Sequence, residues 1–223
     1  MSGGKATGRA GLKLHVGCAN IVVEGWENLD KSPNVFLTRM PRLRRALCRA
    51  KVLADQQAAG FPPGVKHVDA AKRLPYPSGS VAFVYSSHLI EHMTRWQGLR
   101  FLRECHRVLA PGGVVRTATP DLSGIVAEYV DRQRSGERPT AADQLMAQMG
   151  MFQDIDANLA QRLIRRNVSP SWHQWLYDAE SLGALLREAG FTELRTCGYQ
   201  EGEVPDLKLL EKRPESLFIE ASR

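Results

Sequence analysis

Short apolar segments alternate with longer segments of helical period along most of the chain. Seven of the short segments have the length and the period of β-strands, and valine and leucine recur in them. They lie at residues 12–16, 27–30, 65–69, 81–86, 114–119, 193–199 and 216–221. Strands that alternate with helices are typical of a parallel sheet whose crossover helices pack on both faces. We therefore expect an α/β fold with a seven-stranded sheet.

Two helices between these strands have clear start and stop signals. Thr94 is a candidate N-cap for a helix with apolar residues on one side, and the turn at 111–113, Pro-Gly-Gly, would end it. Asp178 is a candidate N-cap for a second such helix, and Gly190 stands where a C-terminal cap belongs. Both helices would cover the sheet.

The alternation of strands and helices is lost between the fifth and sixth strands. We expect a single domain over residues 1–223, in which residues 122–175 form an insertion after strand five. Such an insertion can supply a substrate-binding lid or a contact between two copies in a homodimer.

Composition excludes several classes of protein. Hydrophobic residues make up 43% and charged residues 24% of the chain, as in soluble globular proteins. No uncharged apolar run approaches the roughly 20 residues of a membrane span. The polar N-terminus shows no secretory signal, so we expect a cytoplasmic protein. The four cysteines form no C-x-x-C pair, which favours free thiols over a structural metal site.

The net charge of +6 is concentrated in one short stretch. Residues 39–51 hold six basic and no acidic residues, which equals the whole excess of the chain. Leucines and alanines fall between the charges at helical spacing, which predicts an amphipathic basic helix. A solvated surface helix is the simplest interpretation, and contact with anions or a membrane is the alternative. A nucleic-acid-binding module is disfavoured because no aromatic residues interleave with the basic ones.

Three strand ends carry residues suited to a nucleotide-like ligand. The first strand runs into the small-residue turn Gly17-Cys18-Ala19-Asn20, while Asp30 and Asp69 end the second and third strands. In an open α/β sheet the carboxyl ends of parallel strands meet at one edge, where a carboxylate can hold ribose hydroxyls. Each residue alone could be a turn residue, but the three together favour a binding site.

The motifs as an ordered set resemble the class I S-adenosylmethionine (SAM)-dependent methyltransferases of the type 11 group. The resemblance covers about 12–121 and includes Asp69-Ala70, Ser86-Ser87-His88, the string at 101–113 and Thr119-Pro-Asp121. It implies a Rossmann-like sheet, mostly parallel with an antiparallel last strand, and SAM as methyl donor with S-adenosylhomocysteine as product. The SAM-binding residues that it implies are His15, Gly17, Cys18, Ala19, Asn20, Asp30, Asp69, Ala70, Ser87 and His88.

Some positions depart from this pattern. Similar enzymes usually have an acidic residue at the position of His15 and a second glycine at that of Ala19. The gap from Gly17 to Asp30 is also short, a trait shared with a methyltransferase subgroup that carries the Gly-Trp-x-Asn-x-Asp string found here at 25–30. A nicotinamide-dependent dehydrogenase is disfavoured because it would need G-x-G-x-x-G and an acid about 20 residues further on.

The sequence gives less information about the binding site of the methyl acceptor than about that of the cofactor. Transfer to a hydroxyl needs a general base, and histidine titrates in the useful range. His173 or His88 is the candidate base, with Asp121 assisting, although His88 could instead support the SAM pocket. We expect structural roles for His67 and His106, on a predicted core strand and a predicted helix.

Aromatic residues around His173 suggest a wall for a sugar ring or a planar acceptor. They are Trp172, Trp175 and Tyr177, which could equally pack the insertion onto the sheet. The string at 201–218 resembles the same subgroup, which includes a mycobacterial sugar O-methyltransferase acting on methylmannose oligosaccharides. We therefore expect O-methylation of a saccharide, with another small-molecule natural product, or binding of SAM or nucleic acid without catalysis, as alternatives. No divalent metal is predicted, although a requirement for one stays open.

Overall fold

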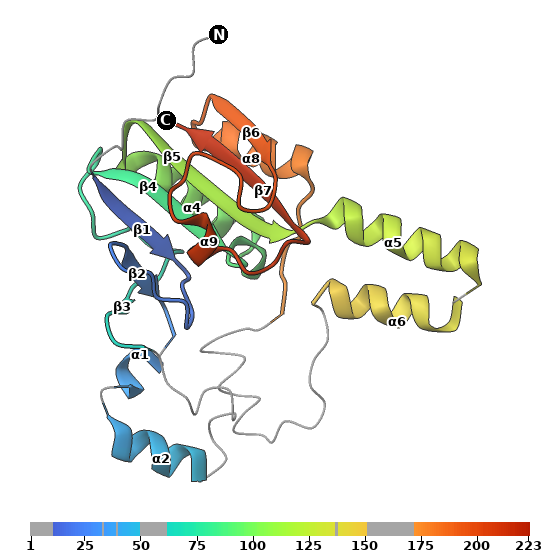
Figure 1. The fold of residues 1–223 in the computed structure, drawn as a ribbon, viewed down its shortest axis with the longest axis horizontal. Helices are drawn as coiled ribbons and strands as arrows, with labels where there is room; N and C mark the ends of the chain where they lie inside the picture. The colour runs from blue at the N-terminus through green and yellow to red at the C-terminus, as the bar shows by residue number, and fades with distance from the viewer. Residues whose placement is uncertain (1–10, 33, 39, 50–61, 137, 151–171) are drawn as a thin grey trace.

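The computed structural model describes residues 11–32, 34–38, 40–49, 62–136, 138–150 and 172–223. Its centre is one seven-stranded sheet with the strand order β3-β2-β1-β4-β5-β7-β6. Strand β7 runs antiparallel to both of its neighbours, and the other pairs are parallel. The predicted mostly parallel α/β sheet with an antiparallel last strand is thus confirmed (Figure 1). The strands are β1 Leu12–Val16, β2 Glu27–Asp30, β3 Lys66–His67, β4 Val81–Ser87, β5 Leu109–Pro120, β6 Glu193–Cys197 and β7 Ser216–Ser222.

Three of the predicted strands differ from the observed ones by more than one residue at an end. The third strand, expected over 65–69, is only the pair Lys66–His67 at the edge of the sheet, with both side chains exposed. His67 is therefore not a core residue; its ring packs against Phe36 at 4.6 Å between ring centroids. The sixth strand ends at Cys197, two residues earlier than expected, because the chain turns there across the sheet.

The fifth strand begins earlier than the sequence suggests. Val81 pairs with Leu109 but Phe83 already pairs with Val114, so β5 contains a bulge. The bulge contains Gly112, whose φ of +71° glycine adopts without strain. Residues 111–113, predicted as a turn, therefore lie within β5 as part of the bulge. The preceding helix ends at Val108.

One face of the sheet is covered by two amphipathic helices, α4 Arg95–Val108 and α8 Ala179–Ala189. Both predicted N-caps are confirmed, because Thr94 and Asp178 accept hydrogen bonds from the backbone in capping boxes. Gly190 forms the predicted left-handed C-cap. The apolar sides of these helices and of β1, β4 and β5 form the main core.

The opposite face is covered mainly by the connection between β6 and β7. This connection contains the short helix α9 Leu207–Leu210 and crosses in front of the sheet (Figure 1). Its apolar residues form a second core cluster with Trp26, Phe83 and Tyr85. The indole of Trp26 also donates a hydrogen bond of 2.9 Å to Asp206.

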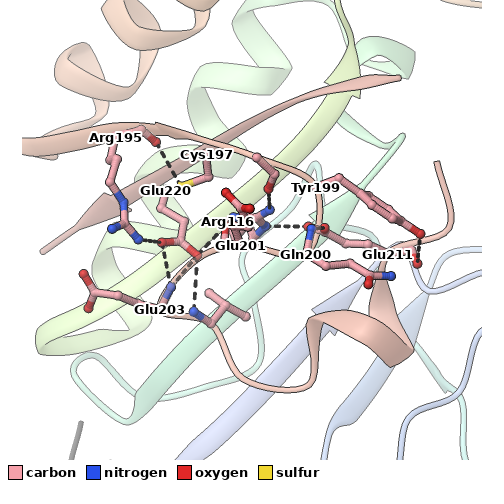
Figure 2. Close-up of polar contacts among 11 residues, drawn as sticks. Arg116, Arg195, Cys197, Tyr199, Gln200, Glu201, Glu203, Glu211 and Glu220 are labelled. Atoms are coloured by element: carbon pink, nitrogen blue, oxygen red, sulfur yellow. Dashed lines mark hydrogen bonds and ion pairs between the residues drawn. The ribbon is translucent and has the colours of Figure 1, made fainter. Parts of the chain in front are cut away.

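A buried arginine ties this connection to the sheet. Arg116 of β5 is fully buried and lies between Glu211 and Glu220, as Figure 2 shows. Its Nε donates to Glu211 at 2.5 Å, and its terminal nitrogens donate to Glu220 at 3.2 Å and to the carbonyls of Glu201 and Gly198 at 2.8 and 2.9 Å. Hydrogen bonds of this kind fix a loop that has few backbone contacts of its own.

Two helical pairs lie outside these layers. Helices α1 Asn34–Leu37 and α2 Pro41–Arg49 precede β3, and α2 coincides with the predicted basic helix but has no buried residue. Arg39 and Lys51 of that prediction lie outside the described residues. Helices α5 Leu122–Ser135 and α6 Arg138–Gln148 lie side by side and project from the end of β5 (Figure 1). The rest of the expected insertion, 151–171, is also outside the described residues.

Two further features bear on the sequence expectations. All four cysteines lie among the described residues and are free thiols. None of the helices in the described part of the chain has both the length and the apolar character that a bilayer span requires.

Candidate active site

The turn after β1 lies at the carboxyl edge of the sheet and is held by backbone hydrogen bonds. The amides of Gly17 and Cys18 both donate to the carbonyl of Leu29 on β2, at 2.8 and 3.0 Å. Gly17 has a φ of +74° and Ala19 a φ of +46°. A side chain on Gly17 would come within 3.1–3.2 Å of Leu89, so a glycine is needed for this tight turn.

Asp30 fastens the same turn from the end of β2. Its carboxylate accepts hydrogen bonds from the amides of Ala19 at 2.9 Å and Ser32 at 2.7 Å. The side chain is only half-buried, so its remaining lone pairs can reach a ligand. Ala19 and Asn20 are exposed beside it.

Asp69 lies one strand further along the same edge. The amide of Val68 donates to the carbonyl of Asp30 at 3.0 Å, which brings the two segments together. Asp69 accepts from the amide of Ala71 at 3.0 Å and is half-buried, while Ala70 is buried. The structure thus brings the predicted turn, Asp30 and Asp69 to one edge of the sheet.

Two other predicted SAM-binding residues lie in the interior. His15 is 2% exposed and lies between Asn28 and Tyr85, and burial lowers its pKa to about 4. The imidazole is therefore neutral at physiological pH. Cys18 is also buried, and burial raises the pKa of its thiol to about 12. In this structure neither side chain is open to a ligand.

His88 follows β4 and faces the C-terminal segment. Its φ of +49° lies in the left-handed region, which is uncommon for a non-glycine residue and frequent at functional sites. Nε2 lies 2.9 Å from the hydroxyl of Ser216. Nδ1 lies 3.0 Å from a guanidinium nitrogen of Arg213 and 3.0 Å from Oε1 of Glu91. Because Nδ1 cannot accept from arginine and donate to a carboxylate at once, two tautomers compete for this position.

Glu91 is the residue that sequence reasoning assigned no role. It lies in the 3-10 helix η1 Ile90–His92 and is fully buried. Oε2 accepts a long hydrogen bond of 3.4 Å from Thr119. Oε1 has no hydrogen bond of good geometry within the described residues, although it lies close to His88. The signal in the sequence was a single acid inside an otherwise apolar run, since Leu89, Ile90 and Met93 surround it.

His173 lies on the segment that returns to the sheet after the insertion. Its ring contacts His92 edge-on, with 5.0 Å between ring centroids. Burial lowers the pKa of His173, and Glu91 nearby offsets this only in part. The imidazole is therefore neutral near pH 7, as a general base must be.

The three aromatic residues near His173 lie in different surroundings. Trp175 is 46% exposed, whereas Tyr177 is 1% exposed and packs in the main core. The carbonyl of Trp172 lies 3.2 Å from Nδ1 of His92. Tyr177 thus packs the returning segment onto the sheet, and its hydroxyl approaches Gly98 of α4.

A cavity of about 590 Å³ opens between the end of β5, helices α5 and α6, and the C-terminal segment. Asp121 at its wall is the N-cap of α5 and accepts from the amide of Ser123 at 3.0 Å. Both candidate bases line the cavity. The lining residues are His88, Pro120, Asp121, Gly124, Ile125, Glu128, Ala147, Gln148, Gly150, His173, Arg213, Glu215 and Ser216.

Comparisons with known proteins find similarity to methyltransferases. The model of a methyltransferase domain family matches residues 37–117. A Mycolicibacterium smegmatis protein described as a "probable S-adenosylmethionine-dependent methyltransferase" is 42% identical over 57 residues, which are 26% of this chain and 21% of that protein. A Mycobacterium tuberculosis protein with the same description is 27% identical over 148 residues, 66% of this chain and 39% of that protein.

A solved SAM-dependent methyltransferase from Archaeoglobus fulgidus aligns with 96% of this chain and 87% of its own, at 15% identity and a TM-score of 0.47. The family match over residues 37–117 and the two named relatives show that this chain is similar to SAM-dependent methyltransferases. The cofactor of this class is SAM. The chain spans about a fifth and two fifths of the lengths of the two mycobacterial relatives.

The observed edge of the sheet fits this cofactor. The glycine turn at 17–20 leaves no room for a larger side chain, and the half-buried carboxylates of Asp30 and Asp69 flank it. Together they place a tight turn and two acids at one strand edge, the arrangement in which α/β proteins hold a nucleoside.

Proposed function

We propose that this protein transfers the methyl group of SAM to a hydroxyl of a small polar acceptor, and that the acceptor is a saccharide. The observation that carries the proposal is the pairing of His88, at the wall of this cavity, with a fully buried carboxylate. SAM supplies an electrophilic methyl group on a sulfonium. The protein must then hold the acceptor in line and remove its proton.

His88 is well arranged to take that proton. When Nδ1–H donates to Glu91, Nε2 carries the lone pair and lies 2.9 Å from the hydroxyl of Ser216. An acceptor hydroxyl that took the place of the Ser216 hydroxyl would lie within reach of the same nitrogen. Glu91 is then a positioning residue, because it fixes the tautomer without contacting the acceptor. His173 is the second candidate base on the same wall.

The cavity also lies next to the proposed cofactor position. Leu89 packs against Gly17, and His88 precedes Leu89 in the chain. A methyl group held above the glycine turn would therefore be near the base. Asp121, Glu128, Gln148 and Arg213 give the cavity both hydrogen-bond donors and acceptors, which suits a polyhydroxylated ligand.

Four finer expectations belong to this proposal. The wall residues Trp172 and Trp175 would contact the acceptor, and residues 122–175 would act as a lid within a single domain. A cytoplasmic location and a homodimer are expected as well. Another small-molecule natural product is the alternative acceptor, and a protein that binds SAM without catalysis is the alternative activity.

The first experiment separates binding from turnover. Calorimetric titration with S-adenosylhomocysteine should give micromolar affinity, and titration with NADH should give none. Asp30→Ala should abolish binding, because it removes the ribose partner and releases the turn at Ala19. Asp131→Ala is the matched control, since its carboxylate is 78% exposed on α5. Equal binding by both variants would contradict the assignment of the cofactor site.

The second experiment tests the acceptor and the base. Methyl transfer from labelled SAM should be detected with members of a panel of mono- and oligosaccharides. His88→Ala should keep its affinity for S-adenosylhomocysteine and lose turnover at least about 100-fold, the usual contribution of a general base. Turnover of His88→Ala at the wild-type rate would refute the role of His88. Binding without transfer to any acceptor would favour a non-catalytic protein.

A further inference from the structure

Three side chains that commonly bind transition metals converge beside the cavity. Donor atoms of Glu91, His92 and His173 all lie within 4.8 Å of one another. We propose that these three residues form a binding site for a divalent transition-metal ion, with Zn²⁺ as the best match. The inference goes beyond methyl transfer and rests on the geometry of this cluster.

Backbone contacts hold the three ligands together. The carbonyl of Glu91 accepts from the amides of Gln174 at 2.7 Å and Trp175 at 3.2 Å. The side-chain amide of Gln174 donates to the carbonyl of His92 at 2.7 Å. The returning segment is thus fastened to η1, which places His173 against the other two ligands although it is distant in sequence.

The buried carboxylate lacks a compensating charge. Glu91 is 0% exposed, and the partners of its carboxylate are a long hydrogen bond from Thr119 and the nearby ring of His88. Oε1 forms no hydrogen bond of good geometry within the described part of the chain. A carboxylate taken out of water is strongly destabilising unless a positive charge accompanies it. A bound dication would supply that charge.

The orientation of His92 also suits a metal ligand. Its Nδ1 lies 3.2 Å from the carbonyl of Trp172, to which Nδ1–H can donate. That hydrogen bond leaves the lone pair on Nε2, as in metal-bound histidines whose other nitrogen donates to a carbonyl or a carboxylate. His173 faces His92 edge-on and has an unpartnered Nδ1 among the described residues.

The ligand set indicates the kind of ion. Two imidazole nitrogens and one carboxylate form the His₂Glu set of open zinc sites, in which water takes the fourth position. Mg²⁺ and Ca²⁺ prefer oxygen ligands and are disfavoured by the two nitrogens. Donors around a tetrahedral Zn²⁺ lie about 3.4 Å apart, so small rotations of the two half-buried histidines would close the site.

Calorimetry with Zn²⁺ on the metal-free full chain at neutral pH tests the site. The wild type should bind one Zn²⁺, and Mg²⁺ should not bind. Glu91→Gln, His92→Ala and His173→Ala should each weaken Zn²⁺ binding at least about tenfold. His67→Ala is the control, because it removes an exposed histidine on the edge strand β3, whereas the proposed ligands Glu91 and His92 follow the central strand β4.

Each outcome decides the proposal. Absence of Zn²⁺ binding by the wild type, unchanged binding in all three ligand variants, or an equal loss in His67→Ala would overturn it. If Glu91→Gln fails to fold by circular dichroism, His92→Ala and His173→Ala decide alone, since these side chains are half-buried. S-adenosylhomocysteine is titrated into each variant in parallel. Retained cofactor binding with lost Zn²⁺ binding shows that the metal site is distinct from the proposed cofactor site.

Discussion

Removal of the buried guanidinium of Arg116 should strongly destabilise the fold. Arg116 and Glu211 are both fully buried and Glu220 nearly so. Arg116→Met keeps the apolar length of the side chain but removes all of its hydrogen bonds. Glu220 retains Arg195 at 2.8 Å and three backbone contacts, whereas Glu211 retains the amide of Gln200 at 2.6 Å. The cost therefore falls mainly on Glu211.

Leaving one member of a buried ion pair uncompensated costs about 3–5 kcal/mol. For a protein of this size, 1 kcal/mol corresponds to roughly 2–4 °C in melting temperature. We therefore expect Arg116→Met to lower the melting temperature by about 10 °C. Circular dichroism and scanning calorimetry on the full chain measure this shift.

The matched control is the exposed ion pair of Arg95 with Glu188. Its atoms lie 3.1 Å apart, but the two side chains are 45% and 40% exposed. Because exposed pairs contribute about 0–1 kcal/mol, Arg95→Ala should change the melting temperature by no more than about 3 °C. If Arg116→Met melts at the same temperature as Arg95→Ala, the buried cluster does not stabilise the fold as argued. The double variant Arg116→Met/Glu211→Leu should recover part of the loss, because no unpaired carboxylate remains at that position.

Two further predictions concern acid stability and the cofactor turn. Burial acts to raise the pKa of Glu220, but hydrogen bonds from Glu203, Arg195 and Val204 and the charge of Arg116 outweigh it and lower the pKa. Stability from Glu220 is therefore complete above the unfolded pKa of about 4.3 and is lost as pH falls towards the folded pKa. The free energy of unfolding, measured with urea between roughly pH 5 and 3, should fall less steeply with decreasing pH in Glu220→Gln than in the wild type. Equal slopes in the two proteins would refute this. Gly17→Val should weaken S-adenosylhomocysteine binding at least tenfold, an order-of-magnitude expectation from its φ of +74° and the contact with Leu89. Gly25→Ala, at a φ of +77° where the flexible end of Lys13 would lie 3.7–4.0 Å from the added carbon, should bind S-adenosylhomocysteine normally by calorimetry, and equal losses in both variants would count against the turn.

Sequence reasoning succeeded where local chemistry decides the structure. The caps at Thr94 and Asp178 depend on residues within a few positions of one another, and both are confirmed. The bulge in β5 was missed because Gly112 looks like an ordinary turn residue. The length of β3 was overestimated because an edge strand with one neighbour is ended by its surroundings rather than by its own pattern.

Long-range contacts set the limit for the candidate site. The ends of β1, β2 and β3 could be placed together because parallel strands share an edge, and Asp30 and Asp69 do lie there. In the sequence, Arg116 is a charged residue within an otherwise apolar strand. Its hydrogen-bond partners are 82–104 residues away in sequence, so they could not be identified from the local pattern. The role of Glu91 depends on its contacts with His88 and with the segment at 172–175, and the second contact joins parts of the chain that are distant in sequence.

The buried cluster and the cavity are connected through the segment between β6 and β7. Arg116 holds Gly198, Glu201 and Glu211 of this segment, and the chain then passes Arg213 and enters β7 at Ser216. Both of these residues contact His88. The carboxylates that compensate the buried charge of Arg116 thus also hold the segment that carries the neighbours of His88, the proposed base. The buried charge of Arg116 does not take part in the chemistry directly. We therefore expect it to act on His88 indirectly, by fixing the positions of Arg213 and Ser216, which contact the imidazole.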